Sequence, residues 1–144
     1  VIKWSIDGGT NWKPAIEYLG YVPEIHQMTT SDLNTTNVKF YGSLSTSVSY
    51  ARLIDGTVTV FGWLQNLVNI TSYPAVELAT LPVGFRPKNL SGVSDTIGWG
   101  GRYNDKVPIL FSVNTSGVIS AQAFSGILGT NNQTLSFKIS FIAA

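Results

Sequence analysis

The stretch Ser94–Asp105, SDTIGWGGRYND, carries the residue types best suited to binding chemistry in this chain of 144 residues. Proteins hold sugars by stacking an aromatic ring on the apolar side of the sugar, while carboxylates, amides and arginines bond to the hydroxyls. Both halves of that requirement occur here, in a glycine-rich setting. The stretch therefore predicts a saccharide-binding site with these candidate ligand-binding residues: Trp99, Arg102, Tyr103, Asp95 and Asp105. The structural alternative is a strand that ends in a glycine-rich loop, with Trp99 packed in the core.

Trp63 and the adjoining stretch Leu64–Tyr73 form a similar but weaker candidate. The tryptophan follows a predicted strand, so a place in the core or in a subunit interface is the favoured interpretation.

The opening stretch SIDGGTNW resembles the Asp-box of sialidases. In that family the motif is a hairpin on the outside of a propeller, it recurs in several blades, and it is not catalytic. It occurs once in this chain, and no repeat of about 40–50 residues follows. We therefore expect a rigid corner, in which Gly8 and Gly9 have positive φ, Asp7 accepts backbone N–H groups and Trp12 packs over the hairpin.

Enzymatic chemistry finds little support in the residue types. The chain has no cysteine, and His26 is its one histidine, so thiolate, histidine-metal and Ser-His-Asp sites are disfavoured. No nucleophile-elbow, P-loop or calcium-loop pattern occurs. A glycosidase needs two carboxylates across a cleft, and eight scattered acids offer many accidental pairs. We predict a protein that is not an enzyme and needs neither a cofactor nor a metal.

The charge pattern limits the partners. Nine basic and eight acidic residues are scattered singly, so a nucleic-acid surface is disfavoured. No apolar stretch approaches the roughly 18 residues that span a membrane, so we expect no membrane insertion. Charged residues make up 12% of the chain, where about 25% is usual. Together with 44% hydrophobic residues, this favours an oligomer that buries part of its surface.

Alternation of apolar and polar residues predicts strands through most of the sequence. The clearest are Leu135–Phe141, Val107–Val113 with a hairpin into Val118–Ala123, and the hairpin Ser47–Trp63 around Asp55-Gly56. We expect a two-residue type I′ turn at Asp55-Gly56, because that dipeptide tolerates φ > 0 at both positions.

Further strands are predicted at Ile2–Ile6, Val38–Tyr41, Val76–Thr80 and Val93–Trp99, and one short helical turn near Pro14–Leu19. This pattern predicts an all-β fold, an antiparallel β-sandwich or jelly-roll-like barrel. We place a boundary between an N-terminal hairpin and linker or shoulder segment, residues 1–36, and a head domain, residues 37–144.

Residues 48–144 resemble a known family in the order of their elements. A hairpin RLIDGTVTVFGW is followed by TLPVGFRP, then ILFSVNTSGVISA, then a last strand LSFKISFIAA. This order is similar to the distal head domain of fibre and baseplate proteins of tailed phages that infect Gram-positive bacteria. The family motif is architectural, so the resemblance assigns structural positions to Leu81, Pro82, Gly84, Phe85, Arg86 and Pro87.

The resemblance implies a trimeric head that binds a saccharide of the host cell surface. The expected partners are two further copies of the chain, a bacterial cell-wall polysaccharide and other phage tail or baseplate proteins. The expected location is the virion tail tip, after assembly in the host cytoplasm. Two other hypotheses stay open: a structural baseplate or tail component that only holds its neighbours, and a depolymerase of the host wall.

Overall fold

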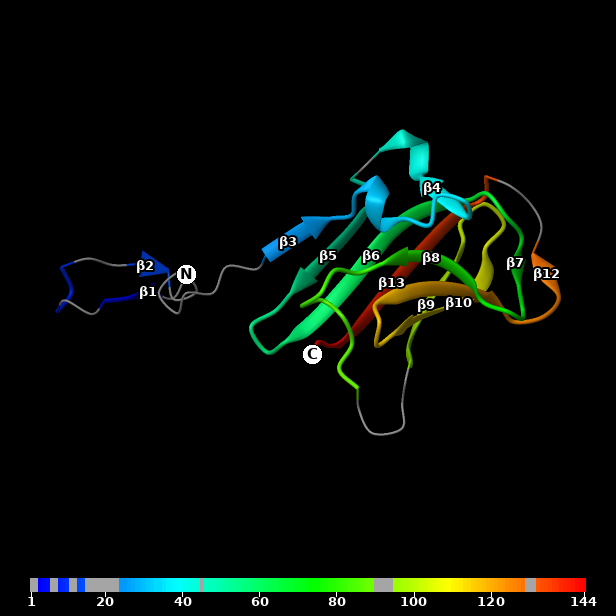
Figure 1. The fold of residues 1–144 in the computed structure, drawn as a ribbon. Coiled ribbons are helices and arrows are strands. Elements are labelled where there is room, and N and C mark those ends of the chain that lie inside the picture. The colour runs from blue at the N-terminus through cyan, green and yellow to red at the C-terminus, as the bar shows by residue number, and fades with distance from the viewer. Residues whose placement is uncertain are drawn as a thin grey trace.

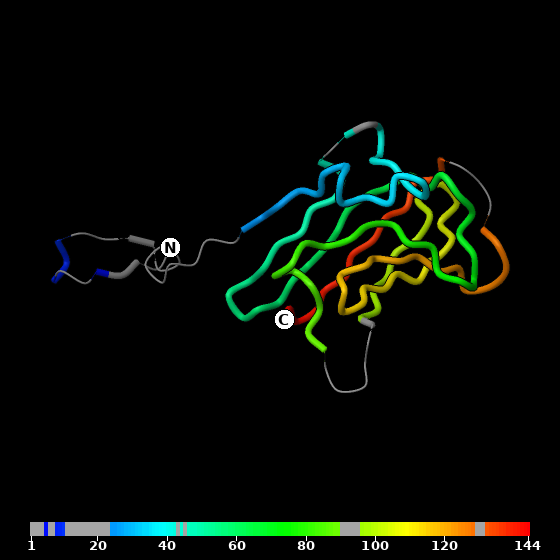
Figure 2. The backbone as a smooth tube through the Cα atoms, viewed as in Figure 1, coloured from blue at the N-terminus to red at the C-terminus, as the bar shows by residue number. Residues whose placement is uncertain are grey.

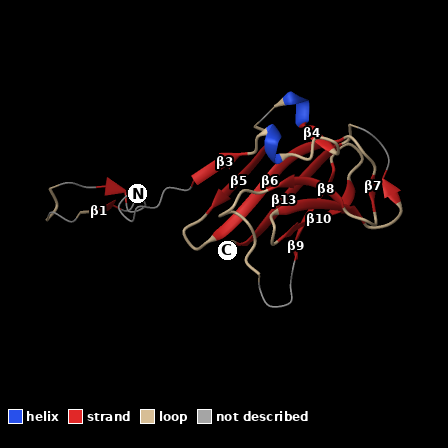
Figure 3. Ribbon diagram, in the orientation of Figure 1, coloured by secondary structure: helices blue, strands red, loops and turns tan. Residues whose placement is uncertain are grey.

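The computed structural model describes residues 3–5, 8–10, 13–14, 24–44, 46–89, 95–128 and 132–144. Strands make up nearly all of its regular structure, with two short 3-10 turns at Thr30–Asp32 and Tyr41–Ser43 (Figure 3). The strands are β1 (Lys3–Trp4), β2 (Lys13–Pro14), β3 (Glu24–Gln27), β4 (Val38–Phe40), β5 (Val48–Arg52), β6 (Thr57–Asn66), β7 (Ile70–Thr71), β8 (Val76–Thr80), β9 (Asp95–Arg102), β10 (Val107–Asn114), β11 (Val118–Ala123), β12 (Ile127–Leu128) and β13 (Thr134–Ile142). The predicted all-β class is confirmed.

Nine strands form one antiparallel sheet that curls into an open barrel, in which the end strands β3 and β8 do not pair with each other (Figure 1). Its order is β3-β5-β6-β13-β9-β10-β11-β8, and β4 pairs with β6 beside this path. The last strand, β13, lies in the middle of the sheet between β6 and β9, where Figure 2 shows it in red. The pair β7–β12 lies at one end of the barrel and the turn between β5 and β6 at the other (Figure 1).

The outer edge of β8 is covered by the segment between β3 and β4. Leu33 bridges to Ala79, and the Asn34 N–H donates to the carbonyl of Leu78 at 2.8 Å. Leu33 is buried in the same hydrophobic core as the later strands, and β3 pairs with β5 along its whole length. Among the described residues the sheet therefore includes β3, which lies before the boundary that we predicted at residue 36.

Alternation explains which side chains fill the barrel. On β13, Leu135, Phe137, Ile139 and Phe141 are buried while Lys138 and Ser140 are exposed, as predicted. Phe111 on β10 stacks on Phe137, with ring centres 5.1 Å apart. Side chains from the inner face of the curled sheet pack in this way into one hydrophobic core.

The turn between β5 and β6 differs from our prediction. The chain does form a hairpin there, but Asp55 does not have positive φ, whereas Gly56 has φ 84°. The Gly56 N–H donates to the Leu53 carbonyl, and the Asp55 carboxylate accepts the N–H of Thr57 at 2.8 Å. This is a three-residue loop of a type I turn followed by a glycine bulge. The type I′ prediction was wrong because the carboxylate of Asp55 bonds within the bulge instead.

The motif TLPVGFRP is architectural, as predicted. Leu81 is fully buried, and Gly84 has φ 93° at the third position of a turn in which the Phe85 N–H donates to the Pro82 carbonyl. Phe85 packs edge-on against Tyr50, with ring centres 4.9 Å apart.

The end of the same motif fastens the last strand of the barrel. Pro87 bridges to Ala143, and the Ala144 N–H donates to the Arg86 carbonyl at 2.9 Å.

The N-terminal hairpin is described only in part. Lys3 pairs with Pro14 and Trp4 with Lys13, while Gly8 and Gly9 have φ of 69° and 89° as expected. The Gly9 N–H donates to the hydroxyl of Ser5 at 2.9 Å. The predictions for Asp7 and Trp12, and most of the helical turn predicted at Pro14–Leu19, lie outside the described residues.

Candidate functional site

Trp99 lies on the outward face of β9 and is 65% exposed. Its neighbours Gly98 and Gly100 face the interior, where a Cβ on Gly100 would lie 2.1 Å from the Ser136 carbonyl oxygen and 2.7 Å from Phe111. The glycines therefore belong to the strand and let it pack closely. The interpretation of a glycine-rich loop with Trp99 in the core was wrong.

The structure does not bring the predicted site residues together. Trp99 and Arg102 are three residues apart on β9, so their side chains leave opposite faces of the strand. Asp95 is the first residue of β9 and pairs with Asn114 at the far end of that strand.

Arg102 and Asp105 bond to each other across the turn between β9 and β10. The Arg102 Nε donates to Asp105 Oδ1 at 3.1 Å, and Nη2 forms an ion pair with Oδ2. The hydrogen bond from Arg102 holds the pKa of the Asp105 carboxyl below its ordinary value. Since both charged groups are engaged in this clamp, they fix the turn.

Tyr103 lies within the clamped turn, near Trp63, the weaker of the two candidates predicted from the sequence. It lines a small cavity of about 100 Å³ with Tyr41, Trp63 and Thr134. The ammonium of Lys106 lies 3.8 Å from the centre of the Tyr103 ring, a cation–π contact.

Six exposed aromatic side chains share the outward side of β6, β13 and β9 and the segments beside them. The register of the sheet places Phe61, Lys138 and Trp99 in one row, and Trp63 beside Ser136 in the next. We call this surface the aromatic face; its members are Tyr41, Phe61, Trp63, Trp99, Tyr103 and Phe124.

Ring contacts hold the aromatic face in place. Tyr41 meets Trp63 edge-on, with ring centres 5.8 Å apart, and Trp99 stacks on Phe124 at 6.0 Å. The Trp63 indole N–H donates to the Ser136 hydroxyl at 3.1 Å. The rings are thus oriented before any ligand arrives.

A groove of about 490 Å³ lies within the aromatic face, and we call it the aromatic groove. Tyr41, Leu44, Phe61 and Trp63 give it apolar walls, while Ser136 and Ser47 add hydroxyls. The Ser47 Oγ is buried, and no residue in the described part of the chain gives it a hydrogen-bond partner.

The aromatic groove depends on a glycine in β6. Gly62 has φ 155°, and a Cβ there would lie 2.2 Å from the carbonyl oxygen of Ser47. The glycine therefore allows β5 to approach β6 closely, which brings Ser47 to the groove while Phe61 and Trp63 point outward from either side of Gly62.

Stacking rings beside hydroxyls suit the binding of a sugar ring, which has an apolar side and a polar rim. No aspartate or glutamate lines the aromatic groove within the described residues. The described residues also contain no group of three or more histidine, cysteine or acidic side chains placed to hold a metal ion. No helix in the described part of the chain has the length and hydropathy needed to cross a membrane.

Sequence reasoning missed Tyr41, Phe61 and Phe124. The alternation of Phe61 and Trp63 about Gly62 was a usable signal, because it puts both rings on one face of a strand. The sequence has no local pattern that places Trp63 near Tyr41 and Tyr103, because their proximity depends on the order of the strands.

Comparison with known proteins bears on the fold. No family model matches the chain, and no curated protein matches it. Among solved structures, the head domain of phage bIL170, one of the receptor-binding domains of lactococcal phages, aligns over 84% of this chain and 100% of its own length. The TM-score is 0.55 and the sequence identity 21%. The chain therefore has the all-β fold of a lactococcal-phage receptor-binding head domain.

Proposed function

We propose that this chain is the head domain of a phage tail protein that binds a saccharide of the host cell wall, without catalysis. The observation that carries the proposal is the aromatic groove on a barrel with this fold. Preoriented Trp63 and Tyr41 rings supply the stacking surface, and the hydroxyl of Ser136 can bond to a sugar rim. A tail protein of a virion meets that saccharide outside the cell, where a domain without cysteine is insensitive to redox conditions.

We further propose that the heads assemble as homotrimers. A low share of charged residues, 12%, and exposed apolar side chains outside the aromatic face, among them Ile25, Ile54 and Ile127, support a surface shared between copies. Several weak sites on one assembly would bind a polymeric wall much more tightly than one site.

The experiment is a binding titration of the full chain with purified wall polysaccharide from candidate Gram-positive hosts, beside a glycan array. Trp63→Ala is expected to weaken binding at least about tenfold, since it removes a stacking surface worth about 1.4 kcal/mol or more. Tyr73→Ala is the matched control: Tyr73 is an exposed aromatic, 86% accessible, that does not line the aromatic groove.

Binding that is equal in wild type and Trp63→Ala would remove the aromatic groove from the proposal. A blank array with every wall preparation would favour the second hypothesis, a structural baseplate or tail component. Release of shorter fragments from the polysaccharide would favour a depolymerase instead. The thermal midpoint and circular dichroism of each variant check that the barrel is intact.

A further inference from the structure

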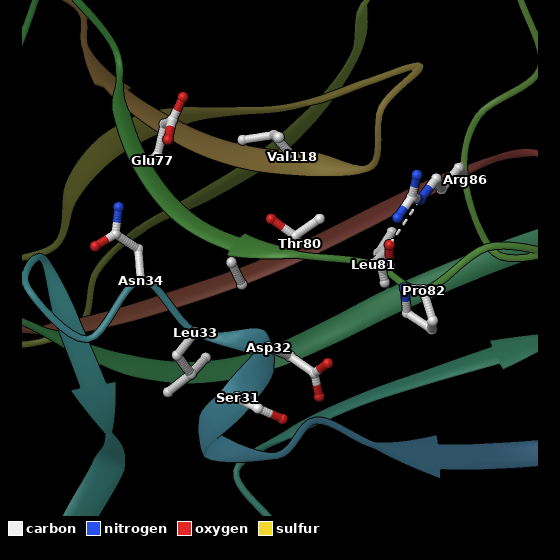
Figure 4. Close-up of a pocket in the computed structure, with 11 residues that line it drawn as sticks. Ser31, Asp32, Leu33, Asn34, Glu77, Thr80, Leu81, Pro82, Arg86 and Val118 are labelled. Carbon is white, nitrogen blue, oxygen red and sulfur yellow. Dashed lines mark hydrogen bonds between the residues drawn. The ribbon is translucent and has the colours of Figure 1, made fainter.

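A second groove, lined mainly by polar groups, lies on the barrel where the segment between β3 and β4 crosses β8 (Figure 4). Its volume is about 420 Å³, and it shares no lining residue with the aromatic groove. We call it the polar groove; the side chains that matter here are Asp32, Asn34, Glu77, Thr80 and Arg86.

Arg86 is fixed at one end of the polar groove. Its Nε donates to the Leu81 carbonyl at 2.9 Å, which Figure 4 marks with a dashed line. Gly117 packs against the same side chain, since a Cβ there would lie 2.8 Å from Arg86 Cγ. The two terminal guanidinium nitrogens make no hydrogen bond or ion pair with any residue in the described ranges. The motif TLPVGFRP thus also presents the two terminal nitrogens of Arg86 as oriented hydrogen-bond donors.

The other walls supply acceptors and further donors. Asn34 is held through its backbone, which donates to Leu78, and its side-chain amide has no partner among the described residues. Glu77 and Thr80 on β8 are both exposed, because the register of β8 on β11 shifts at Leu78, and neither side chain has a partner among the described residues. Asp32 bonds to Thr29 through Oδ2, at 2.7 Å to the N–H and 2.9 Å to the hydroxyl. Figure 4 shows these side chains coming from separate segments around one open space.

The charges select the kind of ligand. Asp32 and Glu77 together outnumber Arg86, so an anion such as a phosphate would face net repulsion. A simple cation would in turn face the guanidinium of Arg86. Hydroxyl groups both donate and accept, so they can bond to carboxylates, to the amide and to the guanidinium at once.

We propose that the polar groove is a second subsite, which binds the hydroxyls of a neutral saccharide unit apart from the aromatic groove. The proposal rests on the saccharide-binding function proposed above and extends it to a second place on the same head. Because Arg86 and the backbone of Asn34 are already held by the fold, ordering them costs little when the ligand binds.

The test is a titration of the full chain with glucose and, separately, galactose, followed by proton–nitrogen correlation NMR. Saturable shifts are expected at the amides of Asn34, Glu77 and Thr80 and at the Arg86 Nε. A variant with Glu77→Ala and Thr80→Val should bind there about tenfold more weakly, because it loses two hydrogen-bonding side chains. The control variant, Glu24→Ala with Thr115→Val, changes an exposed acid and an exposed threonine outside the groove and should leave the shifts unchanged.

Trp63→Ala separates this proposal from the proposed function. Shifts in the polar groove that persist in Trp63→Ala support a second subsite. Shifts confined to the aromatic face would overturn the second subsite and leave the proposed function standing. Larger shifts at Asn34 and Arg86 with inorganic phosphate than with the sugars would overturn the neutral ligand class. If neither sugar shifts the signals of the polar groove while wall polysaccharide still binds, the second subsite is overturned and the proposed function stands.

Discussion

Arg102 and Asp105 form a closed ion pair across the turn between β9 and β10, and the Arg102 Nε lies 3.1 Å from Asp105 Oδ1. The same turn is tied to the start of β13, since the Tyr103 N–H donates to the Thr134 carbonyl and the Thr134 N–H to the Asn104 side chain. Arg102 and Asp105, which we predicted as sugar ligands, thus fasten β9 to the turn that leads into β10.

Asp105→Asn should change how the stability of the chain depends on acid. The pKa of Asp105 is lowered in the folded state, chiefly by the hydrogen bond from Arg102. Its contribution is therefore complete above the pKa of the unfolded chain, about 3.9, and is lost as the pH falls through the lower folded value. Thermal midpoints from about pH 2.5 to about pH 7 should fall less steeply in Asp105→Asn than in wild type. Parallel curves would contradict the clamp, and saccharide binding at neutral pH should be unchanged.

Leu81→Ala should destabilise the barrel by about 2–5 kcal/mol, because it empties a fully buried site in the core. Val83→Ala, in the same motif, changes a side chain that is 81% exposed, so its effect should stay within about 0.5 kcal/mol. Urea unfolding of both variants measures the difference. Equal losses would show that the motif does not act through the burial of Leu81.

Gly100→Ala should cost about 3 kcal/mol, the upper end of the usual range for overpacking, since the added methyl meets backbone of β13 and the Phe111 ring. The control is Gly126→Ala, where the space is open and only the left-handed φ of 65° opposes the change, at about 1–2 kcal/mol. The free energies of unfolding of the two variants separate close packing from backbone strain. A smaller loss at Gly100 than at Gly126 would contradict the close contact of β9 with β13.

Trp99→Ala should weaken binding to wall polysaccharide while the mass measured by light scattering stays that of the wild-type assembly. The reason is that Trp99 is 65% exposed and oriented by its stack on Phe124, which leaves its outer side open to a sugar. Unchanged binding with an intact assembly would remove Trp99 from the site. A drop in mass would assign Trp99 to the contact between copies instead.

The strands were predictable because alternation is a local signal. Val76–Thr80 and Val118–Ala123 match the predicted bounds, and Val107–Val113 falls one residue short of the observed strand end. The glycines of β9 led to the wrong expectation of a loop, because in a sequence a glycine that avoids a clash looks like a glycine that permits a turn. The steric demand on Gly100 comes from Phe111 and from β13, and neither is near it in the chain.

The candidate site was only partly predictable. Trp99, Tyr103 and Trp63 were named from composition, and all three lie on the aromatic face. The separation of Trp99 from Arg102 follows from strand geometry alone and could have been predicted once Asp95–Arg102 was taken as a strand. The aromatic groove could not, because its walls come from the segment before β5, from β6 and from β13, which meet only in the folded sheet.

The central place of β13 has a consequence for how the domain is made. β6 and β9 are synthesised long before β13, yet each pairs with it. Until β13 leaves the ribosome, the two halves of the sheet have no strand to join them, and both present open edges. Such edges invite pairing with other chains, and contacts so distant in sequence form slowly. The sheet therefore cannot be completed before β13 has been synthesised, and a chain cut short before Thr134 is expected to aggregate during synthesis.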